Sequence, residues 1–347
     1  MSFRITTNGM FRSYQSSLIK ANTKLQRSME GVSTHRSFST YAEDPASASK
    51  AFQLRRNMWR ATDQISNSKY LIAKFQSGYV ALSSIVDGSE EEPGLDGIED
   101  ALRGLSDTSG AARKSLGQDL VSKAESIALD MNVHYSDEYV FAGTDGLNPP
   151  FLWEGNTLTY RGVDVNAAAN SADYLKLEEM SSEKSFVDIG LGMQSDGGTG
   201  IIESSAFNSA VAGIKFLNYG VDEDGDPKNL AVLMHELGNL FLSTDEKGDF
   251  ATQEDKDRAS ALTAKLTSAI AYTQEQHVKM SADSTYLESN LEQLNDKSYT
   301  LNEEIDDLEQ ENPANAIMTM YWAQYCYQAS LRIGSDLLSQ SLFDYLR

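Results

Sequence analysis

Apolar residues recur along both ends of the chain with steps that alternate between four and three. From Leu54 to Val86 this spacing continues over nearly five heptads, with Ser68 as its only polar member. The same spacing runs from Leu287 to Leu308 with two polar members. A stripe of this kind is buried only against another helix, so these segments are predicted to pair as a long helical rod. Its expected core residues are Leu54, Met58, Ile65, Ile72, Phe75, Tyr79, Leu294, Leu301 and Ile305.

The two extremities carry a second pair of stripes. A first helix is predicted over residues 5–32 and a last helix over 314–346, after a break at Asn312-Pro313. We expect these helices to form a coiled coil inside an assembly and to fray outside it, which makes residues 1–40 and 310–347 protease-sensitive in the monomer. The expected interface residues are Phe11, Tyr14, Leu18, Leu25, Ile317, Leu331, Leu338 and Tyr345.

Capping signals bound the rod helices. Asp44-Pro45 predicts a helix start, and Asp87-Gly88 predicts the end of that helix. A short helix over 98–105 and a longer one over 111–135 follow, and Thr252 opens a helix that runs to about residue 311.

Between the rod segments the pattern changes to short strands and frequent glycine. A hairpin is predicted around Gly155-Asn156, and one helix over 228–242. The predicted fold is therefore mainly α, with an inserted α+β or β-rich domain and an antiparallel helical rod made from the N- and C-terminal segments. The predicted divisions are a terminal-coil helix and connector at 1–42, a helical rod at 43–142, a middle domain at 143–250, a second rod segment at 251–311 and a terminal-coil helix at 312–347.

Charge is unevenly distributed along a chain of net charge −22. Residues 1–80 contain 12 Lys and Arg against four acids, whereas residues 283–311 contain ten acids and one Lys. We expect the basic and acidic helices to pair, either within the chain or between neighbours. Such acidity argues against nucleic-acid binding. No apolar run is long enough for a membrane span, and the first ten residues do not resemble a secretory signal peptide.

Candidate chemistry is sparse. His235-Glu236 resembles half of a zinc-protease helix, but Asn239 stands where the second His would be, which favours an ordinary surface helix. The alternating acids of residues 222–226 resemble a calcium loop without its bidentate Glu, which favours a solvated turn. Cys326, the single cysteine, is expected to be a buried packing residue. We predict no catalytic site, cofactor or metal.

Both ends carry motifs of a known family. Asn8 and Met10, followed by Glu43-Asp44-Pro45-Ala46, resemble the N-terminal region of the flagellin superfamily, and residues 327–331 and 341–346 resemble its C-terminal region. Within it, Phe141-Ala142-Gly143-Thr144 followed by Pro149-Pro150-Phe151, and the Asp-Tyr-Leu ending, are most similar to the family of hook–filament junction proteins, hook-associated protein 3. The connector departs from the family pattern at residues 32–38.

The resemblance implies a non-enzymatic structural subunit of the bacterial flagellum, exported by the flagellar type III apparatus and located at the hook–filament junction outside the cell. Its implied partners are further copies in a helical tube, hook-associated protein 1, flagellin and a cytoplasmic export chaperone at the C-terminal helix. A filament flagellin with a short middle domain is the alternative within this class. An enzyme or an adhesive module in the middle domain are alternatives from other classes.

Overall fold

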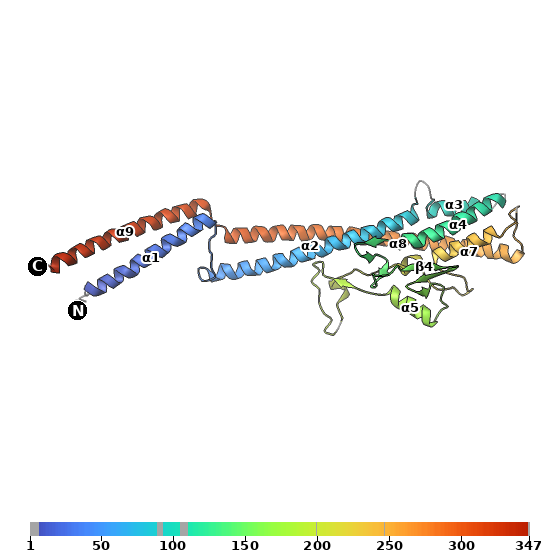
Figure 1. The fold of residues 1–347 in the computed structure, drawn as a ribbon, viewed down its shortest axis with the longest axis horizontal. Helices are drawn as coiled ribbons and strands as arrows, with labels where there is room; N and C mark the ends of the chain where they lie inside the picture. Colours follow the sequence, from blue (N-terminus) through green and yellow to red (C-terminus); the bar gives the residue numbers. More distant parts are fainter. Residues whose placement is uncertain (1–6, 89–92, 105–109, 199, 246, 346–347) are drawn as a thin grey trace. The chain divides into compact units, whose positions relative to one another are not determined.

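The computed structural model describes residues 7–88, 93–104, 110–198, 200–245 and 247–345 (Figure 1). The fold is mainly α with small antiparallel sheets, as the sequence predicts. It divides into two compact units. Residues 1–62 and 296–347 form the terminal unit, and residues 63–295 form the central unit. Helices α2 (Pro45–Val86) and α8 (Gln253–Glu309) contribute to both units.

The terminal unit contains α1 (Thr7–Thr34), α9 (Pro313–Tyr345), the start of α2 and the end of α8. The predicted cap of α2 is confirmed: the Asp44 carboxylate accepts hydrogen bonds from the backbone N–H groups of Ala46 and Ser47, both at 3.1 Å. These bonds satisfy donors that a helix start otherwise leaves unpaired, and Pro45 has no such donor to satisfy.

In the central unit, α3 (Leu95–Gly104), α4 (Gly110–Asp130) and α7 (Leu230–Leu242) accompany α2 and α8. The backbones of α4 and α7 come close together at two glycines. A Cβ atom added to Gly238 would lie 2.7 Å from the Gly117 carbonyl oxygen, so this contact requires glycine. Because α7 packs in this way, most of its side chains are buried. The prediction of a surface helix here is wrong.

Nine short strands in the described part of the chain form small antiparallel sheets. The predicted hairpin is β4 (Phe151–Glu154) with β5 (Thr157–Tyr160), and β6 (Val163–Asp164) adds to β5. The remaining pairs are β1 (His134–Tyr135) with β2 (Glu138–Tyr139), β3 (Ala142–Gly143) with β9 (Val211–Ala212), and β7 (Phe186–Val187) with β8 (Phe207–Asn208). Three elements were not predicted: α5 (Ala172–Ser181), the short turn η2 (Glu203–Ser205) and α6 (Ile214–Leu217).

The segment 143–250 shares one hydrophobic core with the helices of the central unit. The boundaries between the two compact units therefore lie within α2 and α8, rather than at residues 143 and 250. The reason is physical: the strands are too short to bury their apolar side chains against one another, so they use the helices. Among the described residues, no helix is both long and apolar enough to cross a lipid bilayer.

The expected rod-core residues lie on the buried sides of α2 and α8. Leu54, Phe75 and Leu294 are buried. The other six are half-buried: Met58, Ile65, Ile72, Tyr79, Leu301 and Ile305. The polar member of the stripe, Ser68, is completely buried, and its hydroxyl has no hydrogen-bond partner among the described residues.

Candidate functional site

The two ends of the chain pair with each other in the terminal unit, as α1 and α9 (Figure 1). On α1 the contact uses half-buried residues at heptad spacing: Tyr14, Leu18, Ala21 and Leu25. On α9 the covered positions are Ala316, Met320, Ala323, Tyr327, Ser330 and Gly334. Large side chains of α1 thus face mainly small ones of α9, which lets the two backbones approach closely.

Gly334 shows why the small residues are required. A Cβ atom at this position would overlap the hydroxyl and ring of Tyr14. Near the other end of the pair, a Cβ atom added to Gly31 would lie 2.8 Å from a Glu311 carboxylate oxygen, which can move aside because it ends a flexible side chain. Gly334 is therefore the glycine that close packing requires.

The heptad stripe predicted for α9 lies outside this contact. Ile317 is 43% exposed and Leu331 is 44% exposed, whereas Ala316 and Ala323 are buried. On α1, Phe11 is 46% exposed. Ile317, Leu331 and Phe11 therefore lie at exposed positions of this helix pair, whereas most of the covered positions of α9 carry small residues. Their part in contacts between subunits stays a prediction. The side chains of Leu338 and Tyr345 lie outside the described part of α9.

The outer surface of α9 is aromatic. Tyr321, Trp322 and Tyr325 are each more than 60% exposed, and the rings of Trp322 and Tyr325 meet edge to face with centroids 6.4 Å apart. Cys326 is also exposed, so its prediction as a packing residue is wrong. A contiguous exposed apolar surface of this kind is typical of interaction sites, since water solvates it poorly.

The connector between α1 and α2 is hydrogen-bonded to the junction of α8 and α9. The backbone N–H of Ser37 donates to the Glu309 carbonyl at 2.8 Å, and the N–H of Glu311 donates to the His35 carbonyl at 3.0 Å. His35 adopts a left-handed backbone conformation, with φ of +57°. Through these bonds, the connector between α1 and α2 and the turn between α8 and α9 form one hydrogen-bonded junction, called the joint below.

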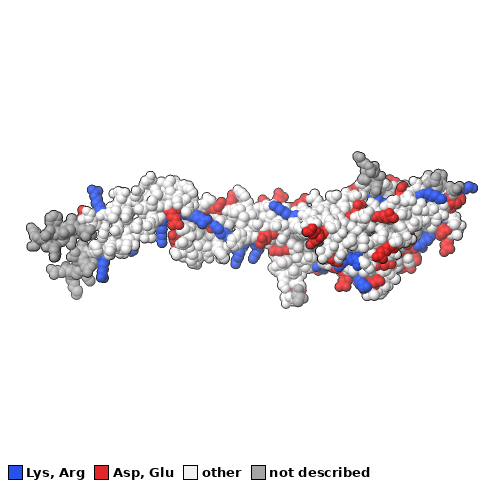
Figure 2. All heavy atoms as spheres, in the orientation of Figure 1, with Lys and Arg blue, Asp and Glu red and all other residues white. Residues whose placement is uncertain are grey.

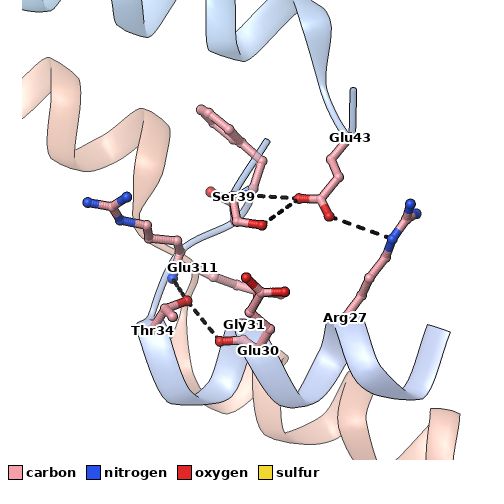
Figure 3. Close-up of a pocket in the computed structure, with 10 residues that line it drawn as sticks. Arg27, Glu30, Gly31, Thr34, Ser39, Glu43 and Glu311 are labelled. Carbon is pink, nitrogen blue, oxygen red and sulfur yellow. Dashed lines mark hydrogen bonds and ion pairs between the residues drawn. The ribbon is translucent and has the colours of Figure 1, made fainter. Parts of the chain in front are cut away.

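A polar hollow of about 210 Å³ lies at this joint (Figure 3). Glu43 reaches across it, accepting a 2.8 Å hydrogen bond from the Ser39 N–H and pairing with Arg27 at 3.6 Å. The Ser39 N–H holds the pKa of Glu43 below its ordinary value, and Arg27 acts in the same direction. The motif that resembles the flagellin superfamily thus has a structural role here: Glu43 fastens the connector and Asp44 caps α2.

In the central unit, the residues considered as candidate metal ligands or catalytic groups make structural contacts instead. His235 is buried, its ring lies 4.9 Å from that of Trp153, and its Nδ1 lies 3.2 Å from the Asn239 amide nitrogen. Among the described residues, Asp222, Asp224 and Asp226 form the single group with metal-ligand proximity. The Lys265 ammonium lies within 3.0 Å of all three carboxylates, where a cation would bind.

Lys265 and the acidic turn stabilise each other's charged forms. Burial lowers the pKa of Lys265, but hydrogen bonds to the three carboxylates outweigh it and raise the pKa above its ordinary value. The same hydrogen bond from Lys265 lowers the pKa of Asp222. The turn is therefore neutralised by the chain itself, and the fit to a divalent cation is poor.

Comparison with known proteins gives a similarity of fold. No protein-family profile matches the sequence, and no curated protein matches it. The structure resembles a solved structure from Vibrio parahaemolyticus, of a protein described provisionally as flagellar hook-associated. The two chains are 14% identical, the alignment covers 77% of this chain and 100% of the other, and the TM-score is 0.54. At this identity the similarity shows a shared fold.

Proposed function

We propose that this protein is a non-enzymatic structural subunit of the bacterial flagellum that connects hook and filament. The observation that carries the proposal is the pairing of the two chain ends as α1 and α9, with the aromatic surface of α9 left exposed. Exposed aromatic side chains are costly to keep in water, and burial against neighbouring subunits would lower that cost. The shared fold with a protein described as flagellar hook-associated agrees with this role.

The proposal includes the partners and the location that the sequence resemblance implies. Copies of the chain would assemble in a helical tube between hook-associated protein 1 and flagellin, outside the cell, after export through the flagellar type III apparatus. A cytoplasmic chaperone would cover the C-terminal helix before export. The exposed aromatic side chains of α9 provide a surface for such a chaperone.

Deletion of the gene tests this role. We expect hooks without attached filaments and flagellin released into the medium, because the adaptor that holds the first filament subunits is missing. Complementation with the intact gene should restore the filaments. Filaments of normal length on the deletion strain would overturn the proposal.

A filament flagellin is the second candidate, because exposed terminal helices suit any subunit of such a tube. Immunogold labelling separates the two. Label confined to a short zone beside the hook supports the adaptor, whereas label along the whole filament supports the flagellin.

A further inference from the structure

The start of α2 and the end of α8 face each other in the terminal unit and leave their other sides exposed. Arg55 of α2 forms a bidentate ion pair with Glu309 of α8, with N–O distances of 2.9 and 2.5 Å. The Ser298 hydroxyl lies 3.5 Å from the Met58 sulfur. Because these contacts fix the inner sides of both helices, their outer sides point away from each other.

The outer side of α2 combines aromatic and basic residues. Steps of four and three place Phe52, Arg56 and Trp59 on one face, with Arg60 beside them. Phe52 is 63% exposed and Trp59 is 65% exposed. Trp and Arg are the residues most enriched at the centres of protein interfaces. This face, Phe52 with Arg56, Trp59 and Arg60, is the basic face.

The outer side of α8 has the complementary composition. Steps of three and four place Asp296, Tyr299 and Glu303 on one face, which Asp307 continues. Tyr299 is 65% exposed, and the three acids are exposed as well. This face, Asp296 with Tyr299, Glu303 and Asp307, is the acidic face.

The charges on these two faces form no ion pair within the described chain, and Glu303 has a hydrogen bond with Tyr299 of the same face. Residues 45–62 contain four basic and no acidic side chains, and residues 296–309 contain six acidic side chains and one Lys. Between these stretches, Arg55 with Glu309 is the one ion pair that the described residues form. Figure 2 shows basic side chains projecting from the α2 edge of this pair and acidic ones from its α8 edge.

We propose that the basic face of one copy of this chain binds the acidic face of a second copy. Both halves of the contact are present on every chain and lie on opposite sides of it, so each copy can bind two neighbours. Such a head-to-tail contact closes into a ring or extends as a helix, depending on the rotation between copies. This inference rests on the proposed function, in which copies of the chain assemble in a tube. The contact between the basic face and the acidic face would be the lateral contact that such a tube requires.

A second copy explains more of the surface than an unrelated partner does. The basic face needs an acidic helix with exposed apolar surface, and the acidic face supplies both through its carboxylates and Tyr299. The opposite charges orient the two copies and speed their association. Burial of the aromatic side chains between those charges gives most of the free energy of binding.

Charge reversal in the full-length protein tests the contact. The variant Arg56→Glu with Arg60→Glu should weaken self-association, followed by sedimentation velocity, about tenfold. The variant Glu303→Arg with Asp307→Arg should weaken it equally. Their combination in one chain should restore it, because every reversed face then meets a reversed face. Wild-type association should also fall between about 50 and about 500 mM NaCl.

The control for the first variant is Lys228→Glu with Lys256→Glu, which lowers the net charge by the same amount at exposed positions elsewhere. It should leave association unchanged, and circular dichroism should show the same helix content for all variants. Three results would overturn the inference: a wild type that stays monomeric, reversed faces that associate as the wild type does, or a combined variant without recovery.

The outcomes separate this inference from the proposed function. If the deletion strain lacks filaments while the reversed variants assemble normally, the flagellar role holds and this contact is wrong. If the deletion strain has normal filaments while the charge swap behaves as expected, the contact holds and the flagellar role is wrong.

Discussion

Tyr14 of α1 occupies the space in which a side chain at Gly334 of α9 would have to lie. This relationship joins residues that are 320 positions apart in the chain. It fixes the register in which α1 pairs with α9, because the phenol ring of Tyr14 fits only opposite a residue without a Cβ atom. Substitutions at this contact therefore test whether α1 and α9 pair in the functional protein.

The first prediction concerns this contact. Gly334→Leu should abolish complementation of the deletion strain, since the leucine cannot share its space with Tyr14. Adding Tyr14→Ala should restore motility at least in part, because a smaller residue then faces the larger one. Ile333→Leu is the matched control, since Ile333 is 58% exposed and a leucine there should therefore preserve motility. Full motility of Gly334→Leu alone would contradict the pairing.

The two sides of α9 should respond differently to a charge. Ala323 is buried against α1, so Ala323→Asp should unpair the helices, at a cost of several kcal/mol. Leu331 is exposed, so Leu331→Asp should preserve the pair and impair assembly. Motility measures assembly for both variants. Protection of the terminal helices from trypsin in the presence of assembled protein measures the pair, and equal trypsin sensitivity of the two variants would refute the distinction.

The acidic turn of the central unit should depend on Lys265. Lys265→Met leaves three carboxylates whose ligand atoms lie within 4.8 Å of one another. We expect a melting temperature lowered by a few degrees, which added Ca²⁺ raises again. The wild type should show no response to Ca²⁺, because its ammonium already neutralises the turn. Lys228→Met serves as a control at an exposed lysine without a described ion pair. Calcium stabilisation of the wild type would contradict the assignment.

The same turn gives a pH dependence of defined sign. Lys265 lowers the pKa of Asp222 from its ordinary 3.8, so the unfolded chain takes up this proton first. The stabilisation is complete above pH 3.8 and is lost as the pH falls through the lower native pKa. In Lys265→Met this contribution should become smaller, because only the backbone N–H groups of Asp224 and Asp226 then lower the pKa of Asp222. Urea unfolding at a series of acidic pH values measures it, and an identical pH dependence of both proteins would count against the linkage.

The close contact of α4 and α7 gives a prediction on stability. Gly to Ala within a helix usually stabilises by about 1 kcal/mol. Gly238→Ala should instead destabilise by about 1–3 kcal/mol, because its Cβ would lie 2.7 Å from the Gly117 carbonyl oxygen. Chemical denaturation measures this change in the free energy of unfolding. A gain in stability would show that the helices can move apart.

The long helices follow from the sequence because their patterns are local. Asp44-Pro45 marks the start of α2, and the heptad stripes mark the buried sides of α2 and α8. The hairpin around Gly155 follows from turn chemistry, since Gly155 has a φ of +65° that favours glycine. In contrast, α5 buries only Leu177, so it carries no stripe that a sequence pattern could reveal.

The candidate site depended on partners that are distant in the sequence. The heptad pattern favoured large apolar residues such as Ile317, whereas Gly334 meets Tyr14, and Ala316 and Ala323 are buried at other positions of the same helix pair. An alternation of small and large residues on one helix is the signal that would have indicated this arrangement. The polar joint gave no such signal, because it depends on backbone hydrogen bonds between residues 35–37 and 309–311.

Cys326 provides the most direct test of the central claim that the outer surface of α9 is covered only in the assembly. It is the single cysteine of the chain and is exposed, so a thiol reagent reports on this surface alone. Labelling should be rapid in the isolated full-length protein and slowed at least about tenfold in purified hook–filament structures, since neighbouring subunits exclude the reagent. Equal labelling rates in both states would contradict the account.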